Sequence, residues 1–167
     1  MASPRQAGKF PFMLSLVAAV VIAMPSSGQV TAADPGKQAA VVADYHTGLA
    51  LGGYDPVAYF AEKKPVPGRA DLEFADARGV FRFRNEGNRD AYAANPEVYA
   101  PQFSGYDPLA LARGIALEGN PLEWEIVGDR LYLFYSPQAH AAFKENPAQA
   151  ISMAAERWPA IASSITR

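Results

Sequence analysis

Two short motifs hold the side chains of this chain that could do chemistry. Gly53-Tyr54-Asp55-Pro56 and Gly105-Tyr106-Asp107-Pro108 each place a phenol next to a carboxylate, and the two tyrosines are 52 residues apart. Carboxylate oxygens bind hard divalent cations, but an Asp before Pro is also a common helix N-cap, worth about 1 kcal/mol. The cap is the favoured interpretation of Asp55.

The side chains of both motifs could bind a cation or a polar ligand if the two turns share one groove. His46 ends the first predicted strand, beside the first turn, and could join them, the alternative being a solvated or satisfied histidine. A divalent metal ion, of unknown identity, is therefore expected at Asp107, Asp55 and His46. Tyr54 and Tyr106 are the expected ligand-binding residues. Oxygen donors with at most two histidines suit hard or borderline ions rather than Cu(I).

The two motifs belong to a longer internal repeat with an offset of 50 to 52 residues. Further matches in the same order pair Leu72-Glu73-Phe74 with Leu122-Glu123-Trp124, Phe81 with Tyr132, Phe83 with Phe134, Tyr92 with Phe143, and Asn95-Pro96 with Asn146-Pro147. Such a repeat predicts two copies of one supersecondary unit. We therefore predict an α+β fold in which two tandem-duplicated helix-hairpin-helix units, about 53–100 and 105–152, form a mainly antiparallel sheet with flanking helices and pseudo-two-fold symmetry.

Turn, capping and alternation signals predict the elements of each unit. Apart from the two short helices after the Asp-Pro pairs, these elements are a first strand over 39–45, hairpins over 72–84 and 124–135, helices following Asn85 and Ser136, and a last helix from Asn146 through Trp158. His140, on the helix after the second hairpin, is interpreted as a solvated or satisfied histidine. Glu123 and Glu125 alternate with Trp124, which is typical of the wet face of a strand.

The first 33 residues are predicted to be a signal peptide, and residues 34–167 a single domain. Arg5 and Lys9 precede an apolar run over 10–24, and small residues near Ala33 suit signal peptidase. The run is short for a membrane span, although an uncleaved anchor is the alternative. We expect a periplasmic or secreted protein without stable membrane insertion after cleavage.

Composition excludes several classes of function. The chain has no cysteine, which excludes thiol redox chemistry, thiolate metal sites and lipoprotein anchoring. Residues 34–167 carry 13 basic and 17 acidic side chains, a net charge of 13 − 17 = −4, with no basic stripe for nucleic acid. No motif of a zinc helix, a phosphate loop or a catalytic triad is present, so no catalytic residue is predicted.

Three stretches agree with the pattern of a known family. They are Gly48-Leu49-Ala50-Leu51-Gly52-Gly53-Tyr54-Asp55-Pro56-Val57-Ala58-Tyr59-Phe60, Phe81-Arg82-Phe83, and Asn88-Arg89-Asp90-Ala91-Tyr92-Ala93-Ala94-Asn95-Pro96-Glu97-Val98-Tyr99-Ala100-Pro101-Gln102-Phe103. Through these stretches the chain resembles the secreted YHS-domain proteins, including the YHS-domain selenoproteins. The likeness runs from about Tyr45 to Pro159. YHS domains are small metal-binding or metal-associated modules, so the resemblance implies a periplasmic protein linked to metal handling.

The chain departs from that family at the second turn. The secreted group typically has Gly-Gly-Tyr followed by cysteine or selenocysteine, whereas this chain reads Ser104-Gly105-Tyr106-Asp107. An Asp keeps an anion at the helix N-terminus but gives up all sulfur chemistry. Two outcomes stay open: Asp107 holds a harder cation through oxygen, or it is a cap retained in a domain that lost the ancestral activity.

The resulting functional prediction is a secreted, non-catalytic YHS-like module that binds or handles metal. One alternative is a small-molecule binding module that uses a tyrosine-rich groove, since Tyr offers an apolar body with a polar tip. Others are an enzyme that uses Asp107 as acid or base, and an envelope interaction protein that has lost the ancestral redox or metal site. Protein partners are left unknown.

Overall fold

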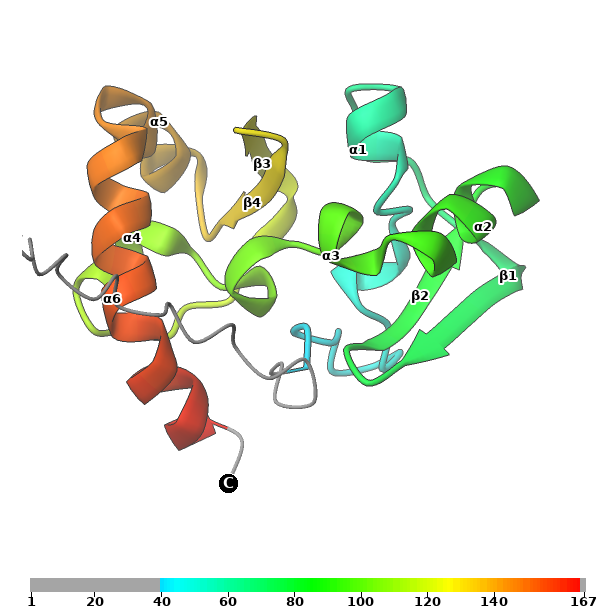
Figure 1. The fold of residues 1–167 in the computed structure, drawn as a ribbon, viewed down its shortest axis with the longest axis horizontal. Helices are drawn as coiled ribbons and strands as arrows, with labels where there is room; N and C mark the ends of the chain where they lie inside the picture. The colour runs from blue at the N-terminus through cyan, green and yellow to red at the C-terminus, as the bar shows by residue number, and fades with distance from the viewer. Residues whose placement is uncertain (1–39, 166–167) are drawn as a thin grey trace, which may run out of the picture. The chain divides into compact units, whose positions relative to one another are not determined.

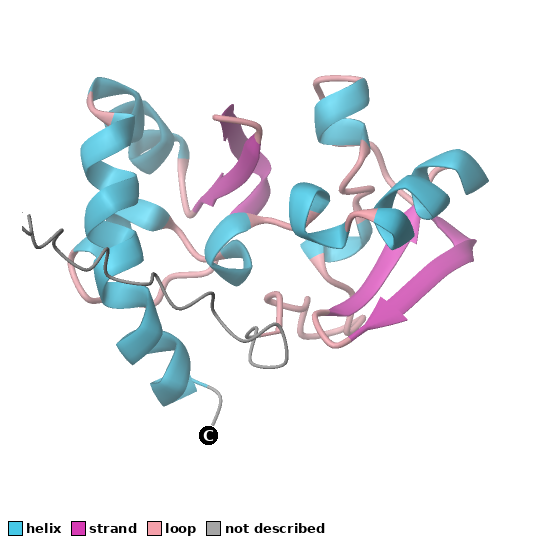
Figure 2. Cartoon of the chain, in the orientation of Figure 1, coloured by secondary structure: helices cyan, strands magenta, loops and turns pink. Residues whose placement is uncertain are grey.

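The computed structural model describes residues 40–165, so the predicted signal peptide lies outside the described residues. Within 40–165 the chain has six α-helices and two antiparallel sheets of two strands each (Figures 1 and 2). The predicted α+β class is confirmed. The strands form two separate hairpins, which corrects the expectation of one mainly antiparallel sheet.

The elements follow one another in the same order in the two halves of the chain. The first half contains the 3-10 turn η2 (Leu51–Gly53), α1 (Ala58–Ala61), β1 (Arg69–Asp76), β2 (Gly79–Phe83), α2 (Glu86–Ala94) and α3 (Pro96–Tyr99). The second half contains the 3-10 turn η3 (Gln102–Gly105), α4 (Pro108–Ala112), β3 (Asn120–Val127), β4 (Arg130–Phe134), α5 (Pro137–Glu145) and α6 (Pro147–Ile165). Both predicted hairpins and the helices after them are therefore present.

Side-chain caps fix the starts of α2 and α5. The side chain of Asn85 accepts a hydrogen bond from Asn88 N at 2.8 Å, and Ser136 Oγ accepts one from Ala139 N at 3.2 Å. Each cap satisfies a backbone donor that the first turn of a helix leaves unpaired. These two predicted helix starts are confirmed.

The segment before the first turn differs from its prediction. The sequence predicts a strand over residues 39–45, but the described part of this segment forms only an isolated bridge. Val41 N donates to Arg78 O in the first half at 2.7 Å, and Val42 N donates to Ser104 O in the second half at 2.8 Å. Its hydrogen bonds go to two different regions, so this connecting segment (residues 40–45) joins the halves instead of extending one sheet.

Strand β4 is buried on both faces because it packs against two hydrophobic clusters. Leu131 and Leu133 belong to the larger cluster, which also holds residues of the first half such as Tyr59. Tyr132 and Phe134 belong to the smaller cluster, with Phe143 and Ala150 of α5 and α6. The alternation of a strand places successive side chains on opposite faces, so a single strand serves both clusters.

Tyr92 leaves a buried hydroxyl group without a partner in the core. Its side chain is fully buried among Phe74, Phe81 and Phe83, and no hydrogen-bond partner for the hydroxyl lies among the described residues. Burial raises the pKa of this phenol, so it stays neutral. An unsatisfied buried polar group costs about 1–3 kcal/mol.

We expect Tyr92→Phe to raise the free energy of unfolding by about 1 kcal/mol, because the variant removes the unsatisfied hydroxyl and keeps the ring. Chemical denaturation measures the change. The control is Phe143→Tyr at the corresponding buried position of the second half, which should destabilise. A loss of stability in Tyr92→Phe would contradict the expectation, since it would mean that the hydroxyl has a favourable partner.

Candidate functional site

The carboxylate of Asp55 is buried and fully engaged in hydrogen bonds. Its side chain is 0% exposed. Oδ1 accepts from Val57 N at 2.8 Å and Ala58 N at 3.3 Å, where α1 begins. Oδ2 accepts from Arg84 N at 2.9 Å and from Asn88 Nδ2 at 2.7 Å, just beyond β2 and in α2. One carboxylate thus joins the turn, the helix and the end of the hairpin.

Asp107 has the same role in the second half. Its side chain is 1% exposed, and Oδ1 accepts from Leu109 N at 2.7 Å and Ala110 N at 3.2 Å as the N-cap of α4. Oδ2 accepts from Tyr135 N at 2.9 Å, just beyond β4. The second turn therefore has a helix cap that also bonds to the backbone just after the hairpin.

The carboxylate oxygens of Asp55 and Asp107, predicted as metal ligands, are already engaged. Hard cations take six or more oxygen ligands, whereas the oxygens of Asp55 and Asp107 already accept hydrogen bonds that a bound cation would have to replace. His46 lies in an exposed turn, where its backbone N–H donates to Asp44 Oδ1 and its ring contacts Tyr45. Over residues 40–165 no group of three or more acidic or histidine side chains is arranged to hold a metal ion.

The two predicted tyrosines lie at equivalent places but have different neighbours. Tyr54 packs against the larger hydrophobic cluster, whereas the Tyr106 ring lies 5.8 Å from that of Trp158 in α6. Burial, and then the charge of Glu118, raise the pKa of Tyr106. The backbone of Tyr106 also forms an isolated antiparallel β-bridge with that of Glu118. No contact between the two phenols is present in the described structure, and neither tyrosine lines the cavity described below.

Both turns that precede the Tyr-Asp-Pro residues are backbone-strained in the same way. Residues 51–53 have φ values of +54°, +57° and +82°, and residues 103–105 have +52°, +54° and +87°. Leu51, Phe103 and Ser104 are not glycines, and each left-handed residue of this kind costs about 1–2 kcal/mol. Strain of this kind persists where the surrounding structure holds it, and it clusters at binding and active sites.

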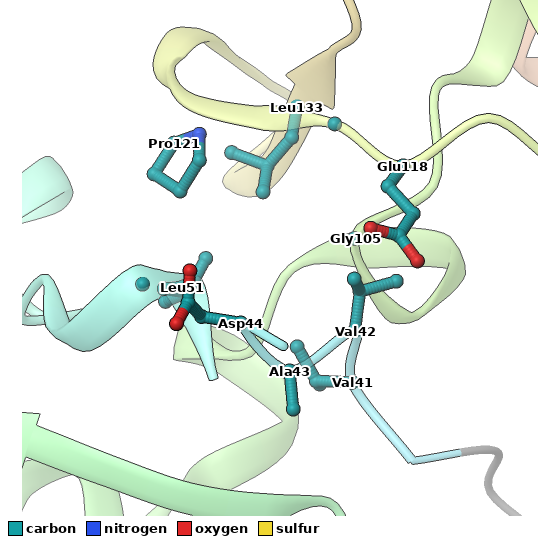
Figure 3. Close-up of a pocket in the computed structure, with 11 residues that line it drawn as sticks. Val41, Val42, Ala43, Asp44, Leu51, Gly105, Glu118, Pro121 and Leu133 are labelled. Atoms are coloured by element: carbon teal, nitrogen blue, oxygen red, sulfur yellow. The ribbon is translucent and has the colours of Figure 1, made fainter. Parts of the chain in front are cut away.

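A small cavity of about 140 Å³ lies between these two turns. Figure 3 shows Asp44 and Glu118 on either side of it, with Leu133 and Pro121 on one wall and Val42 on the opposite one. The residues that line it come from the connecting segment, from both turns, from the loop before β3 and from β3 and β4: Val41, Val42, Ala43, Asp44, Leu51, Gly52, Gly105, Glu118, Gly119, Pro121 and Leu133. It is the place where the connecting segment and both turns meet.

The sequence interpretation missed this cavity. Asp44 and Glu118 stand in irregular segments, 74 residues apart, and no spacing rule brings such positions together. The one available signal is the repeat itself, since Gly52 and Gly105 belong to its two equivalent turns.

The interpretation also missed a charged cluster on the outer side of the second hairpin. His140 Nε2 lies 2.9 Å from Glu125 Oε2, and Nδ1 lies 3.3 Å from Glu123 Oε2. The imidazole stacks on the ring of Phe134, 4.6 Å away, and Lys144 forms an ion pair with Glu125. The two carboxylates meet opposite edges of the imidazole, so the three groups cannot converge on one ion. His140 is a satisfied histidine that holds α5 on the hairpin.

This cluster makes stability depend on pH through Glu125. Partial burial would raise the pKa of Glu125, but hydrogen bonds from His140 and Lys144 outweigh it and lower the pKa below its ordinary value near 4.5. A lowered folded-state pKa stabilises the fold above the unfolded value, and this stabilisation is lost as pH falls through the folded value. We expect Glu125→Gln to cost up to about 1 kcal/mol at pH 7 and less at pH 3, below the unfolded value.

Urea unfolding at the two pH values measures this difference. Glu97→Gln is the control, because Glu97 is exposed and its side chain has no ion pair within residues 40–165. An equal cost of Glu125→Gln at both pH values would show that the charge of Glu125 contributes nothing.

Comparison of the chain with models of protein families, with curated proteins and with solved structures found no match.

Proposed function

We propose that the chain is a secreted or periplasmic YHS-like module that binds a small ligand and is not an enzyme. In this proposal two tandem helix-hairpin-helix units are related by a pseudo-two-fold axis, and the ligand occupies the cavity between their Gly-Tyr-Asp-Pro turns. The observation that carries the proposal is that both strained turns and the connecting segment contribute to the wall of one cavity.

Equivalent backbone hydrogen bonds support the tandem duplication. Gly68 N donates to Gly53 O, and Gly119 N donates to Gly105 O, each at 2.9 Å. Both hairpins also carry an irregularity at the same place, after Arg69 and after Asn120. Shared irregularities are stronger support than shared elements, because regular hairpins arise easily without common ancestry.

The state of the two carboxylates favours binding over catalysis. A general acid or base must reach the proton that it transfers. Asp107 is buried and accepts three backbone hydrogen bonds, so neither oxygen is presented to a substrate. The enzyme that the sequence left open at Asp107 therefore has less support than a binding module.

A thermal-shift screen of small molecules and divalent ions against the purified protein tests the proposal. Val42→Trp is designed to fill the cavity, since Val42 is half-buried and lines it. Val98→Trp is the control, at a half-buried valine of α3 that does not line the cavity. We expect a ligand that stabilises the natural chain and Val98→Trp but not Val42→Trp. A ligand that binds all three proteins equally would place the site elsewhere and overturn the proposal.

A divalent ion is the second candidate ligand, which the resemblance to YHS domains supports. The same screen distinguishes a divalent ion from a small organic ligand. The variant Asp107→Ala then tests whether the ion binds at the second turn. Loss of ion binding in Asp107→Ala, with the fold intact by circular dichroism, would favour metal handling at the second turn. Ion binding that persists in this variant would exclude Asp107 as the ligand.

A further inference from the structure

The volume of the cavity limits the size of its occupant. The cavity holds about 140 Å³, whereas sites for drug-sized ligands measure roughly 300–1,000 Å³. The occupant is therefore smaller than a drug-sized molecule. A nucleotide, a haem or a peptide side chain with its backbone is too large.

Two exposed carboxylates without a cationic partner favour a positively charged occupant of the cavity. No Lys, Arg or His lines it, and neither Asp44 nor Glu118 has an ion pair within residues 40–165. Asp44 Oδ1 accepts hydrogen bonds from Thr47 N and Thr47 Oγ1, and these bonds lower the pKa of Asp44. Asp44 is therefore ionised at neutral pH, and its Oδ2 has no partner among the described residues.

The other walls distinguish an organic cation from a metal ion. Leu51 and Leu133 are almost fully buried, and with Pro121 and Val42 they give the cavity apolar walls. A hard divalent ion needs six or more oxygen ligands, which apolar walls do not supply. A short hydrocarbon chain gains from the same walls, because burial of apolar surface is favourable.

We propose that the cavity binds a small organic ammonium ion, which is attracted by the carboxylates of Glu118 and Asp44 on either side of the cavity and whose hydrocarbon part lies against Leu51 and Leu133. This inference rests on the proposed function, since it names the ligand class of the same cavity. The site prefers a small cation to a neutral molecule of the same shape, and it disfavours an anion.

Titration calorimetry with n-butylammonium and with 1-butanol, its neutral counterpart, tests the inference on the purified protein. We expect butylammonium to bind about tenfold more tightly than butanol, since one charge interaction of moderate strength is worth about that factor. Glu118→Gln and Asp44→Asn should each weaken the binding of butylammonium several-fold and leave the binding of butanol unchanged. Asp44→Asn keeps Oδ1 for the Thr47 hydrogen bonds, and Glu97→Gln is the control for a distant charge.

The outcomes separate failure of the inference from failure of the proposed function. Equal binding of butanol and butylammonium, blocked for both by Val42→Trp, would overturn the ammonium assignment and keep the cavity as the binding site. Binding of Mg²⁺ or Zn²⁺ that is lost in Glu118→Gln, without butylammonium binding, would assign the cavity to a metal ion and also overturn it. If butylammonium binds Val42→Trp as tightly as the natural chain, both the inference and the proposed site fail.

Discussion

Asp55→Ala is expected to lower the free energy of unfolding by about 3–5 kcal/mol. The variant removes one buried carboxylate and leaves without an acceptor the N–H groups of Val57 and Arg84 and the side-chain amide of Asn88. Ala58 N keeps the backbone carbonyl of Asp55 as its acceptor. Loss of a cap alone costs about 1 kcal/mol, and each buried donor left unsatisfied costs about 1–3 kcal/mol before the chain relaxes. Urea unfolding followed by circular dichroism measures the loss.

Two other aspartates calibrate this result. Asp107→Ala also leaves three donors without this acceptor, so its cost should be similar, about 3–5 kcal/mol. Asp44→Ala also removes a turn carboxylate, but from an exposed site, and should cost about 1 kcal/mol or less. Equal costs for Asp55→Ala and Asp44→Ala would mean that the bonds to the hairpin and to α2 contribute nothing.

The sequence predicts the elements of this fold well because their boundaries are set by local chemistry. Asn85 and Ser136 cap helices through hydrogen bonds three residues along the chain, and such bonds are readable from sequence alone. The alternation around Phe81 and Phe83 likewise predicts a buried strand face, which the structure confirms. What these signals do not contain is how the two hairpins are joined, so one sheet was expected where there are two.

The candidate site is less predictable because its residues meet only through tertiary contacts. Asp55 is correctly interpreted as a cap from the Asp-Pro pair, but its bonds to Arg84 and Asn88 span 29 and 33 residues and leave no local trace. Glu118 lies in a loop with no motif, yet it lines the cavity. The internal repeat indicates the two turns. The cavity between them depends on how the connecting segment packs, which the repeat does not show.

Gly119→Ala is the second substitution with a large expected effect, at about 3 kcal/mol of unfolding free energy. An added Cβ would lie 2.4 Å from Leu133 Cβ and 2.7 Å from Gly105 O, and neither atom is the end of a flexible side chain. Overpacking of this kind costs typically 1–3 kcal/mol and more where backbone must move. Because Gly119, Gly105 and Leu133 all line the cavity, the variant should also weaken the binding of any ligand found in the thermal-shift screen.

Gly68→Ala and Gly128→Ala separate the steric effect from the effects of the ligand site and of backbone conformation. Gly68 is the equivalent of Gly119 in the first half, where an added Cβ would meet Arg82 Cβ at 2.4 Å, but it does not line the cavity. Gly68→Ala should therefore lose as much stability as Gly119→Ala, but ligand binding should stay unchanged. Gly128 has a φ of +57° and open space around it, so its variant should cost only the 1–2 kcal/mol or so of a left-handed residue. If Gly119→Ala cost no more than Gly128→Ala, the close approach of the loop to β4 would not be what requires glycine, and the matching geometry of the two halves would lose its physical explanation.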